Sequence, residues 1–272
     1  MIGISANSSL LATHNVRIAG NGEQYVVLSH GFGSDQSVWK YVLPYLVNDF
    51  KVILYDLMGA GTTNPDDFNF SRYSSLHAYA DDLLAILDEL EIERCVFVGA
   101  SVSGMVGCLA SVERPDVFKK LILLAPSPRY LNDVGYYGGF DQKDLDQLYG
   151  DMKSNFKSWV TGFGPLAVGS DLESSAVQEF SRTFYSMRPD IALSVCKTIF
   201  QSDLRATVPL VTVPVHLLQT RNDMAVPFDV ANYLLHNLGG WASMDVLNTE
   251  GHLPHLSHPN EVVPVLMRCL AS

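Results

Sequence analysis

The chain has 272 residues, of which 47% are hydrophobic, enough to form one large buried core. Its formal net charge is −11, and it has no basic cluster to offset phosphate repulsion, which argues against nucleic acid and anionic membranes as partners. The four cysteines show neither paired spacing nor metal-ligand spacing, so we expect reduced thiols, no metal site, and a cytoplasmic and nuclear location. The amino-terminal residues lack the basic and long apolar segments of a secretory signal.

The first half of the chain predicts strands and helices in alternation. Its apolar runs and helically spaced leucines predict strands at 14–18, 25–29, 51–55, 95–98 and 120–124, with helices at 37–46 and 76–90. Gly20-Asn21-Gly22 is a hairpin turn signal, so we expect the first two strands to pair. Residues 95–112 are uncharged, but three glycines and three serines there favour a buried strand, turn and helix over a membrane span. Such alternation is typical of a mostly parallel sheet with helices on both faces.

The alternation stops between Pro126 and Thr207, where the pattern is almost wholly helical and rich in aromatic residues. It then resumes with a strand at 215–220, a helix at 230–238, a strand at 244–247 and a last helix at 261–270. We therefore predict an α/β fold in two parts. Residues 1–125 and 208–272 form the core, and residues 126–207 form a helical lid that is inserted after the sixth strand.

A serine at the junction of a strand and a helix is the first catalytic candidate. Gly99-Ala100-Ser101-Val102-Ser103 follows the strand at 95–98 and precedes a helix-forming stretch. A turn this tight strains the serine and needs small residues two positions away on each side, which are Gly99 and Ser103 here. The pattern is that of the nucleophile elbow of an α/β-hydrolase, and it makes Ser101 the expected nucleophile. Ser103 is a weak alternative, because its own neighbours at that spacing include Met105.

A serine nucleophile needs a base, and the base needs an acid that orients it. Asp223 follows the strand at 215–220 and His252 follows the strand at 244–247, in the chain order Ser, Asp, His that this fold uses. Both lie at the carboxyl ends of parallel strands, where an open α/β sheet forms its site. The alternatives are a turn-forming Asp223, acids at Asp203 or Asp171, and bases at His255 or His258.

An oxyanion needs two backbone N–H donors beside the nucleophile. We expect one from Val102, the residue after Ser101, and the second from Phe32 in the loop His30-Gly31-Phe32-Gly33 that follows the second strand. The ring of Phe32 would also form a wall of the pocket. The alternative is that the glycines of this loop only make a turn.

Longer blocks of sequence identify a family. The chain resembles the plant karrikin-insensitive and strigolactone-receptor family of α/β-hydrolases, close to the bacterial stress-regulator hydrolases, over nearly its whole length. The blocks that carry the resemblance are HGFGSDQSVW from His30, YDLMGAGTTNPDDF from Tyr55, SPRYLND from Ser127, GGF from Gly138, FGPLAVG from Phe163, QEFSRT from Gln178, MRPDIALSV from Met187, IFQSDLR from Ile199 and GHLPHLSHP from Gly251.

The resemblance implies a hormone receptor that keeps a working triad, attacks a butenolide ring with its serine and releases the products slowly, without a cofactor. It also implies ligand-dependent recruitment of an F-box protein of a ubiquitin ligase and a Clp-ATPase-like repressor by a monomeric receptor. An aromatic cavity below a helical lid suits such an apolar ligand, although core packing is the alternative role for any one aromatic residue. The pocket residues carried over by position are Phe32, Tyr130, Leu148, Trp159, Phe163, Phe180, Phe200, Met224 and Ala225.

Two positions depart from the family pattern. Ala100 stands where the family usually has histidine, and Gly104 stands where it usually has alanine. In a standard elbow the side chain of Ala100 points away from the pocket, so we expect altered packing and retained chemistry. Two other functions stay open: an ordinary esterase or carbon–carbon hydrolase, and a binding module with a vestigial triad. The complete triad argues against a binding module. Blocks such as FGPLAVG, which hydrolysis alone does not require, argue against an ordinary esterase or carbon–carbon hydrolase.

Overall fold

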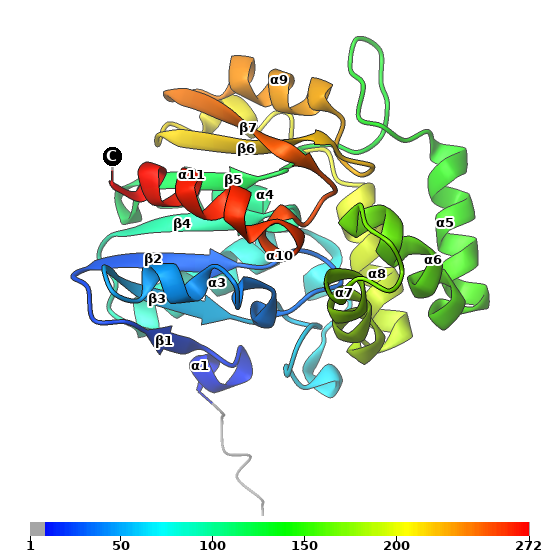
Figure 1. The fold of residues 1–272 in the computed structure, drawn as a ribbon, viewed down its shortest axis with the longest axis horizontal. Coiled ribbons are helices and arrows are strands. Elements are labelled where there is room, and N and C mark those ends of the chain that lie inside the picture. The colour runs from blue at the N-terminus through cyan, green and yellow to red at the C-terminus, as the bar shows by residue number, and fades with distance from the viewer. Residues whose placement is uncertain (1–8, 272) are drawn as a thin grey trace, which may run out of the picture.

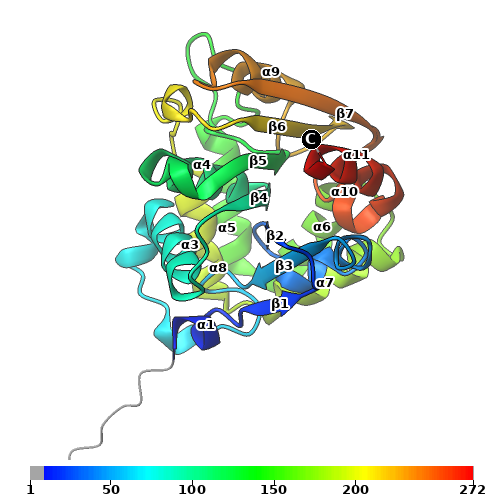
Figure 2. The ribbon, with the colours of Figure 1, turned by 90° about the vertical axis from the view of Figure 1, so that its left-hand side faces the viewer.

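The centre of the fold is a seven-stranded sheet (Figures 1 and 2). In this computed structural model, which describes residues 9–271, the strands lie in the order β1-β3-β2-β4-β5-β6-β7. All neighbouring strands are parallel except β1 and β3, so the predicted, mostly parallel α/β sheet is confirmed. The strands are β1 (Arg17–Ala19), β2 (Gln24–Ser29), β3 (Phe50–Tyr55), β4 (Cys95–Ala100), β5 (Phe118–Leu124), β6 (Val215–Asn222) and β7 (Ala242–Glu250).

The predicted hairpin between the first two strands is wrong. β1 pairs with β3, with Arg17 opposite Leu54, while β2 has the parallel strands β3 and β4 on its two edges. Gly20, at φ +87°, and Gly22 instead take the chain past the backbone of residues 47–50, where a Cβ at Gly22 would lie 2.1 Å from a carbonyl oxygen. These glycines therefore permit a close crossing of two segments, and do not form a turn between paired strands.

Helices cover both faces of the sheet. In Figure 2, α3 (His77–Glu89) and α4 (Val102–Glu113) lie on one side, and α10 (Pro254–Ser257) and α11 (Pro259–Ala271) lie on the other. The expected helix at 37–46 is a 3₁₀ turn, Gln36–Trp39, followed by the short α2 (Leu43–Leu46). The remaining helices of this part are α1 (Leu10–Thr13) and α9 (Phe228–Asn237), and α9 packs on β6 and β7. Among residues 9–271, no helix combines the length and the apolar character needed to cross a membrane.

Four helices interrupt the alternation between β5 and β6. They are α5 (Gln142–Ser154), α6 (Phe156–Val168), α7 (Ser175–Ser186) and α8 (Pro189–Phe200), and Figure 1 shows them together beyond one end of the sheet. Local signals begin these helices: the Asn155 side chain accepts from the Ser158 N–H at 3.0 Å, and Pro189 is the first residue of α8. The insertion follows β5, the fifth strand of the described residues, and not the sixth strand as predicted. Before the insertion the described residues form the antiparallel strand β1 and the four parallel strands β2 to β5, and no further strand.

Residues 126–141, the first part of this insertion, are not helical, contrary to the prediction. Prolines and glycines interrupt any helical pattern there, and the segment forms isolated bridges within itself and with Asp203. Arg129 donates to Asp203 at 2.7 Å, and Arg205 donates to Asp133 at 2.6 Å and to Asp203 at 2.7 Å. These ion pairs hold the first part of the insertion against the chain that follows α8.

Candidate active site

Ser101 occupies the tight turn between β4 and α4. Its backbone has φ 57° and ψ −122°, a region that residues other than glycine rarely adopt, and this is the strain expected of a nucleophile elbow. Close packing explains its small neighbour: a Cβ at Gly99 would lie 2.7 Å from the ring of Phe97 and 2.7 Å from the carbonyl oxygen of Ser103. The turn places the Ser101 hydroxyl at the carboxyl end of β4.

Ser101, His252 and Asp223 form a continuous chain of hydrogen bonds. The Ser101 hydroxyl donates to Nε2 of His252 at 2.7 Å, and Nδ1 of His252 donates to Oδ2 of Asp223 at 2.7 Å. The other oxygen of Asp223 accepts from the N–H groups of Ala225 at 2.8 Å and Val226 at 3.1 Å. Because the Asp223 side chain is fully buried, these bonds fix both its position and the tautomer of His252. The arrangement can take the proton from Ser101 and stabilise the imidazolium that forms.

The alternative candidates have other roles in the structure. The fully buried Ser103 hydroxyl donates to the carbonyl of His30 and accepts from the Ser29 hydroxyl at 2.8 Å, so it is not available as a nucleophile. Asp203 belongs to the ion pairs with Arg129 and Arg205. Two further candidates, Asp171 and His258, are exposed to solvent and lie outside this chain of hydrogen bonds.

Two backbone N–H groups flank the nucleophile. Within residues 9–271, neither the Phe32 N–H nor the Val102 N–H donates to a protein acceptor. The close approach of their two loops favours a glycine, since a Cβ at Gly31 would lie in a tight contact, 3.1 Å from the Cβ of Ser101. Free donors beside a nucleophile suit a developing oxyanion, and the assignment of Phe32 and Val102 to that role stays a prediction.

An apolar cavity adjoins Ser101. Its free volume is about 30 Å³, enough for one or two water molecules. Tyr130 and Ser101 both line this cavity, and burial raises the pKa of the Tyr130 phenol. Six of the predicted pocket residues line the cavity, namely Phe32, Tyr130, Phe163, Phe180, Phe200 and Ala225.

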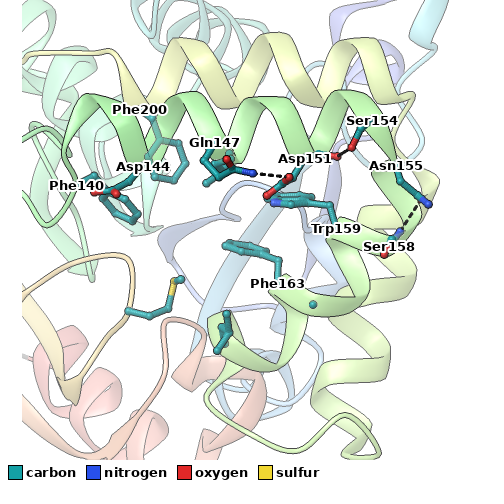
Figure 3. A pocket seen from close by; sticks show the side chains of 14 residues that line it. Phe140, Asp144, Gln147, Asp151, Ser154, Asn155, Ser158, Trp159, Phe163 and Phe200 are labelled. Carbon is teal, nitrogen blue, oxygen red and sulfur yellow. Dashed lines mark hydrogen bonds between the residues drawn. The ribbon is translucent and has the colours of Figure 1, made fainter.

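The other three predicted pocket residues, Leu148, Trp159 and Met224, line a separate groove along α5 and α6 (Figure 3). This groove has a volume of about 560 Å³ and is open to solvent along α5. Phe163 and Phe200 line both the groove and the cavity, so they form the wall between the two. A ligand that reaches Ser101 from the groove has to pass these two rings.

The inserted helices contact both halves of the catalytic apparatus. The His252 N–H donates to the carbonyl oxygen of Ala167 in α6 at 2.7 Å. Next to it, a Cβ at Gly251 (φ +88°) would lie 2.1 Å from the carbonyl oxygen of Val168. On the other side, the Thr183 hydroxyl in α7 donates to the carbonyl of Gly33 at 2.8 Å, in the loop that contains Phe32. The base and the expected oxyanion donor are therefore both held by the insertion.

Sequence reasoning missed several residues of the cavity wall. Ala100 is among them, and the expectation that its side chain points away from the pocket stays a prediction. His255, which the sequence suggests only as a competing base, also lines the cavity; its position three residues after His252 at the start of α10 is the available signal. The remaining unpredicted members of the lining are Gly31, Ala167, Ile199 and Leu253.

One cluster among the described residues has the geometry of a metal site. The ligand atoms of His216, Asp245 and Cys269 lie within 4.8 Å of one another, remote in sequence from Ser101. However, His216 is hydrogen-bonded to both Ser243 and Asp245, and Arg268 donates to Asp245 at 2.6 Å. These contacts balance the charge of the Asp245 carboxylate without a metal ion. Serine-hydrolase chemistry by a triad needs no metal ion.

Comparisons with known proteins agree with this geometry. The profile of the alpha/beta hydrolase family matches residues 26–265. The chain is 60% identical to a karrikin insensitive 2 receptor from Petunia hybrida, over 94% of each chain. It is 50% identical to a strigolactone esterase from Arabidopsis thaliana, over 96% of this chain and 98% of that one. Among solved structures, a hydrolase from Oleispira antarctica is 31% identical, with a TM-score of 0.92 over 97% of each chain.

The family identity covers the fold and all the segments that form the site. The matched residues include the turn at Ser101 and its hydrogen-bonded partners His252 and Asp223. The chain belongs to the α/β-hydrolase family, in the group that contains the karrikin-insensitive 2 receptors and the strigolactone esterases.

Proposed function

We propose that this chain is a butenolide receptor with slow serine-hydrolase activity. One observation carries the proposal: the hydrogen-bonded chain Asp223–His252–Ser101 faces an apolar cavity enclosed by inserted helices, in a chain 60% identical to a karrikin receptor. The triad supplies the chemistry of ester cleavage. The helices supply a part of the protein that a bound ligand can reposition.

The first half of the reaction acylates the serine. Nε2 of His252 takes the Ser101 proton while Oγ attacks the lactone carbonyl, and a new C–O bond forms. The negative charge on the former carbonyl oxygen is stabilised by the N–H groups of Phe32 and Val102. The ring C–O bond then breaks, and His252 returns the proton to the ring oxygen. Asp223 holds the imidazolium throughout, since its carboxylate accepts from Nδ1.

The second half releases the acyl group. A water molecule gives its proton to Nε2 of His252 and attacks the acyl carbon, and the bond to Ser101 breaks as the proton returns to Oγ. Because the free volume beside Ser101 holds only one or two water molecules, product departure requires movement of the surrounding side chains. Slow product release follows from this enclosure.

Ligand binding and lid conformation are coupled in this proposal. A butenolide is larger than the present cavity, so Phe163 and Phe200 have to move to admit it. A ligand shifts a conformational equilibrium only through the difference in its affinity for the two states. Contacts with the aromatic residues of the insertion provide that difference, because they change when these rings move.

The signalling role extends the proposal beyond the site. Ligand-induced repositioning of residues 126–207 creates a surface that recruits an F-box protein of a ubiquitin ligase and a Clp-ATPase-like repressor to the monomeric receptor, in the cytoplasm and nucleus. What supports this is the identity with receptors of this group and the contact of α6 and α7 with the catalytic loops.

Turnover separates this function from that of an ordinary esterase. The probe is 3-methylfuran-2(5H)-one with a 4-nitrophenoxy group at C5, which releases 4-nitrophenolate once the ring is cleaved. We expect a burst close to one product per protein molecule, followed by turnover far below the rate of about 10 per second of a median enzyme. Sustained turnover at that rate without a burst contradicts the receptor and supports the esterase. Absence of any product contradicts both.

A further inference from the structure

His255 is a fully buried histidine that has no hydrogen-bond partner. It lies in the short helix α10 and is 1% exposed. Neither Nδ1 nor Nε2 has a partner in the structure. Its ring packs on Trp39 with the ring centres 4.4 Å apart at 30°, and the Trp39 Nε1 also lacks a partner. Stacking therefore gives this imidazole packing contacts but no hydrogen bond.

An orphan imidazole in a core requires an explanation, because most buried polar groups are hydrogen-bonded. A buried donor or acceptor without a partner destabilises the folded state relative to an apolar group of the same shape. Burial lowers the pKa of His255 from 6.5 to about 3, and the charges of His252 and His30 act in the same direction. The ring is therefore neutral, with one nitrogen that can donate and one that can accept.

The location of His255 in the cavity wall explains why its nitrogens have no partner in the protein. It lines the same cavity as Ser101 and His252. The polar groups of Ser101, His252 and Asp223 are already bonded to one another. His255 is thus a polar side chain of this wall whose hydrogen-bonding capacity is unused.

We infer that His255 is a ligand-recognition residue, whose neutral imidazole hydrogen-bonds an oxygen of a small uncharged lactone held at Ser101. This inference rests on the proposed function and adds a specificity-determining contact to it. A site with a buried donor and acceptor discriminates against analogues that leave those groups unpaired. The His255 imidazole forms a hydrogen bond only when the lactone is present. A carbocyclic ligand of the same shape has no oxygen and therefore forms no hydrogen bond with His255.

Two probes and four variants test the inference. The probes are 3-methylfuran-2(5H)-one and 1-methylcyclopentene, which share a five-membered ring and a methyl group but differ in their oxygens. His255→Phe keeps a flat ring against Trp39 without nitrogens, and His255→Leu provides a second apolar variant. His255→Asn keeps hydrogen-bonding capacity. His14→Leu is the matched control, because His14 is a buried histidine bonded to the Asp56 carbonyl and lies outside the cavity lining.

Dissociation constants are measured by titration followed by protein NMR. We expect His255→Phe and His255→Leu to bind the lactone about tenfold more weakly than wild type, with less than a twofold change for the carbocycle. His255→Asn should recover most of the lactone affinity, and His14→Leu should bind both probes as wild type does.

Three results overturn the inference. Equal lactone affinity in wild type and the apolar variants removes His255 from recognition but leaves the proposed function intact. An equal loss for both probes shows a packing role instead. If wild type does not bind the lactone, the proposed function and the inference fail together. Should one apolar variant fail to fold, the other one and His255→Asn decide the outcome.

Discussion

The buried imidazole of His255 makes the stability of this protein sensitive to mild acid. In the folded state its pKa is about 3, whereas an exposed histidine has a pKa of 6.5. Between these values the unfolded chain binds a proton that the folded chain does not. The free energy of unfolding therefore falls as the pH is lowered from 6.5 toward 3, and replacement of His255 by leucine removes this contribution.

The two pKa values set the magnitude. At pH 5 the unfolded chain holds the proton almost fully, so His255 lowers the stability by about 2 kcal/mol relative to pH 7.5, by linkage. For a chain of this length, about 2 kcal/mol corresponds to a shift in Tm of roughly 4–8 °C. The other titrating groups contribute equally to wild type and variant, so the difference between the two proteins isolates His255.

Urea denaturation at pH 7.5 and pH 5 measures this difference. Wild type should lose about 2 kcal/mol more than His255→Leu when the pH is lowered. His255→Asn, which also cannot titrate, should behave like the leucine variant. If wild type and His255→Leu lose the same stability between the two pH values, then His255 is accessible to protons in the folded state. That result would refute the reasoning about its burial.

Three further substitutions test the site. Ser101→Ala should lower hydrolysis of the chromogenic butenolide by a factor on the order of a thousand or more with an unchanged Tm, and retention of a tenth of the activity would exclude Ser101 as nucleophile. Asp223→Asn should also strongly reduce hydrolysis, because an amide cannot stabilise the His252 imidazolium, while ligand affinity should be largely kept. Wild-type activity in this variant would show that another residue is the acid of the triad. Phe32→Ala should weaken binding of the butenolide by about 2–4 kcal/mol through loss of an aromatic wall, as measured by titration, and unchanged affinity would remove Phe32 from the pocket.

The positions of the expected catalytic residues could be predicted because each residue follows a strand directly. A buried apolar run, a tight turn with small residues and a following helix specify Ser101 within a few residues of sequence. Asp223 and His252 come just after β6 and β7, and parallel strands bring their carboxyl ends to one edge. Local sequence is enough for such placements, since the sheet supplies the long-range geometry.

Features that depend on distant partners could not be predicted in this way. The pairing of β1 with β3 depends on which sheet edge is free, and Gly20 and Gly22 look the same in a hairpin and in a chain crossing. Likewise, the division of the aromatic residues between cavity and groove depends on how α5 and α6 pack. Trp159 and Phe163 lie four residues apart on α6, yet only Phe163 also lines the cavity. The orphan nitrogens of His255 are visible only when all of its neighbours are in place.

In the proposed function a ligand at Ser101 acts through the inserted helices, and hydrogen exchange tests this coupling most directly. The Ser101→Ala variant is saturated with 3-methylfuran-2(5H)-one, so that binding is observed without cleavage. Amide exchange is then followed by mass spectrometry in the presence and absence of the ligand. We predict that exchange changes more within residues 142–200 than within β2 to β5. A bound ligand that leaves exchange in residues 142–200 unchanged would contradict the receptor mechanism and leave a simple hydrolase.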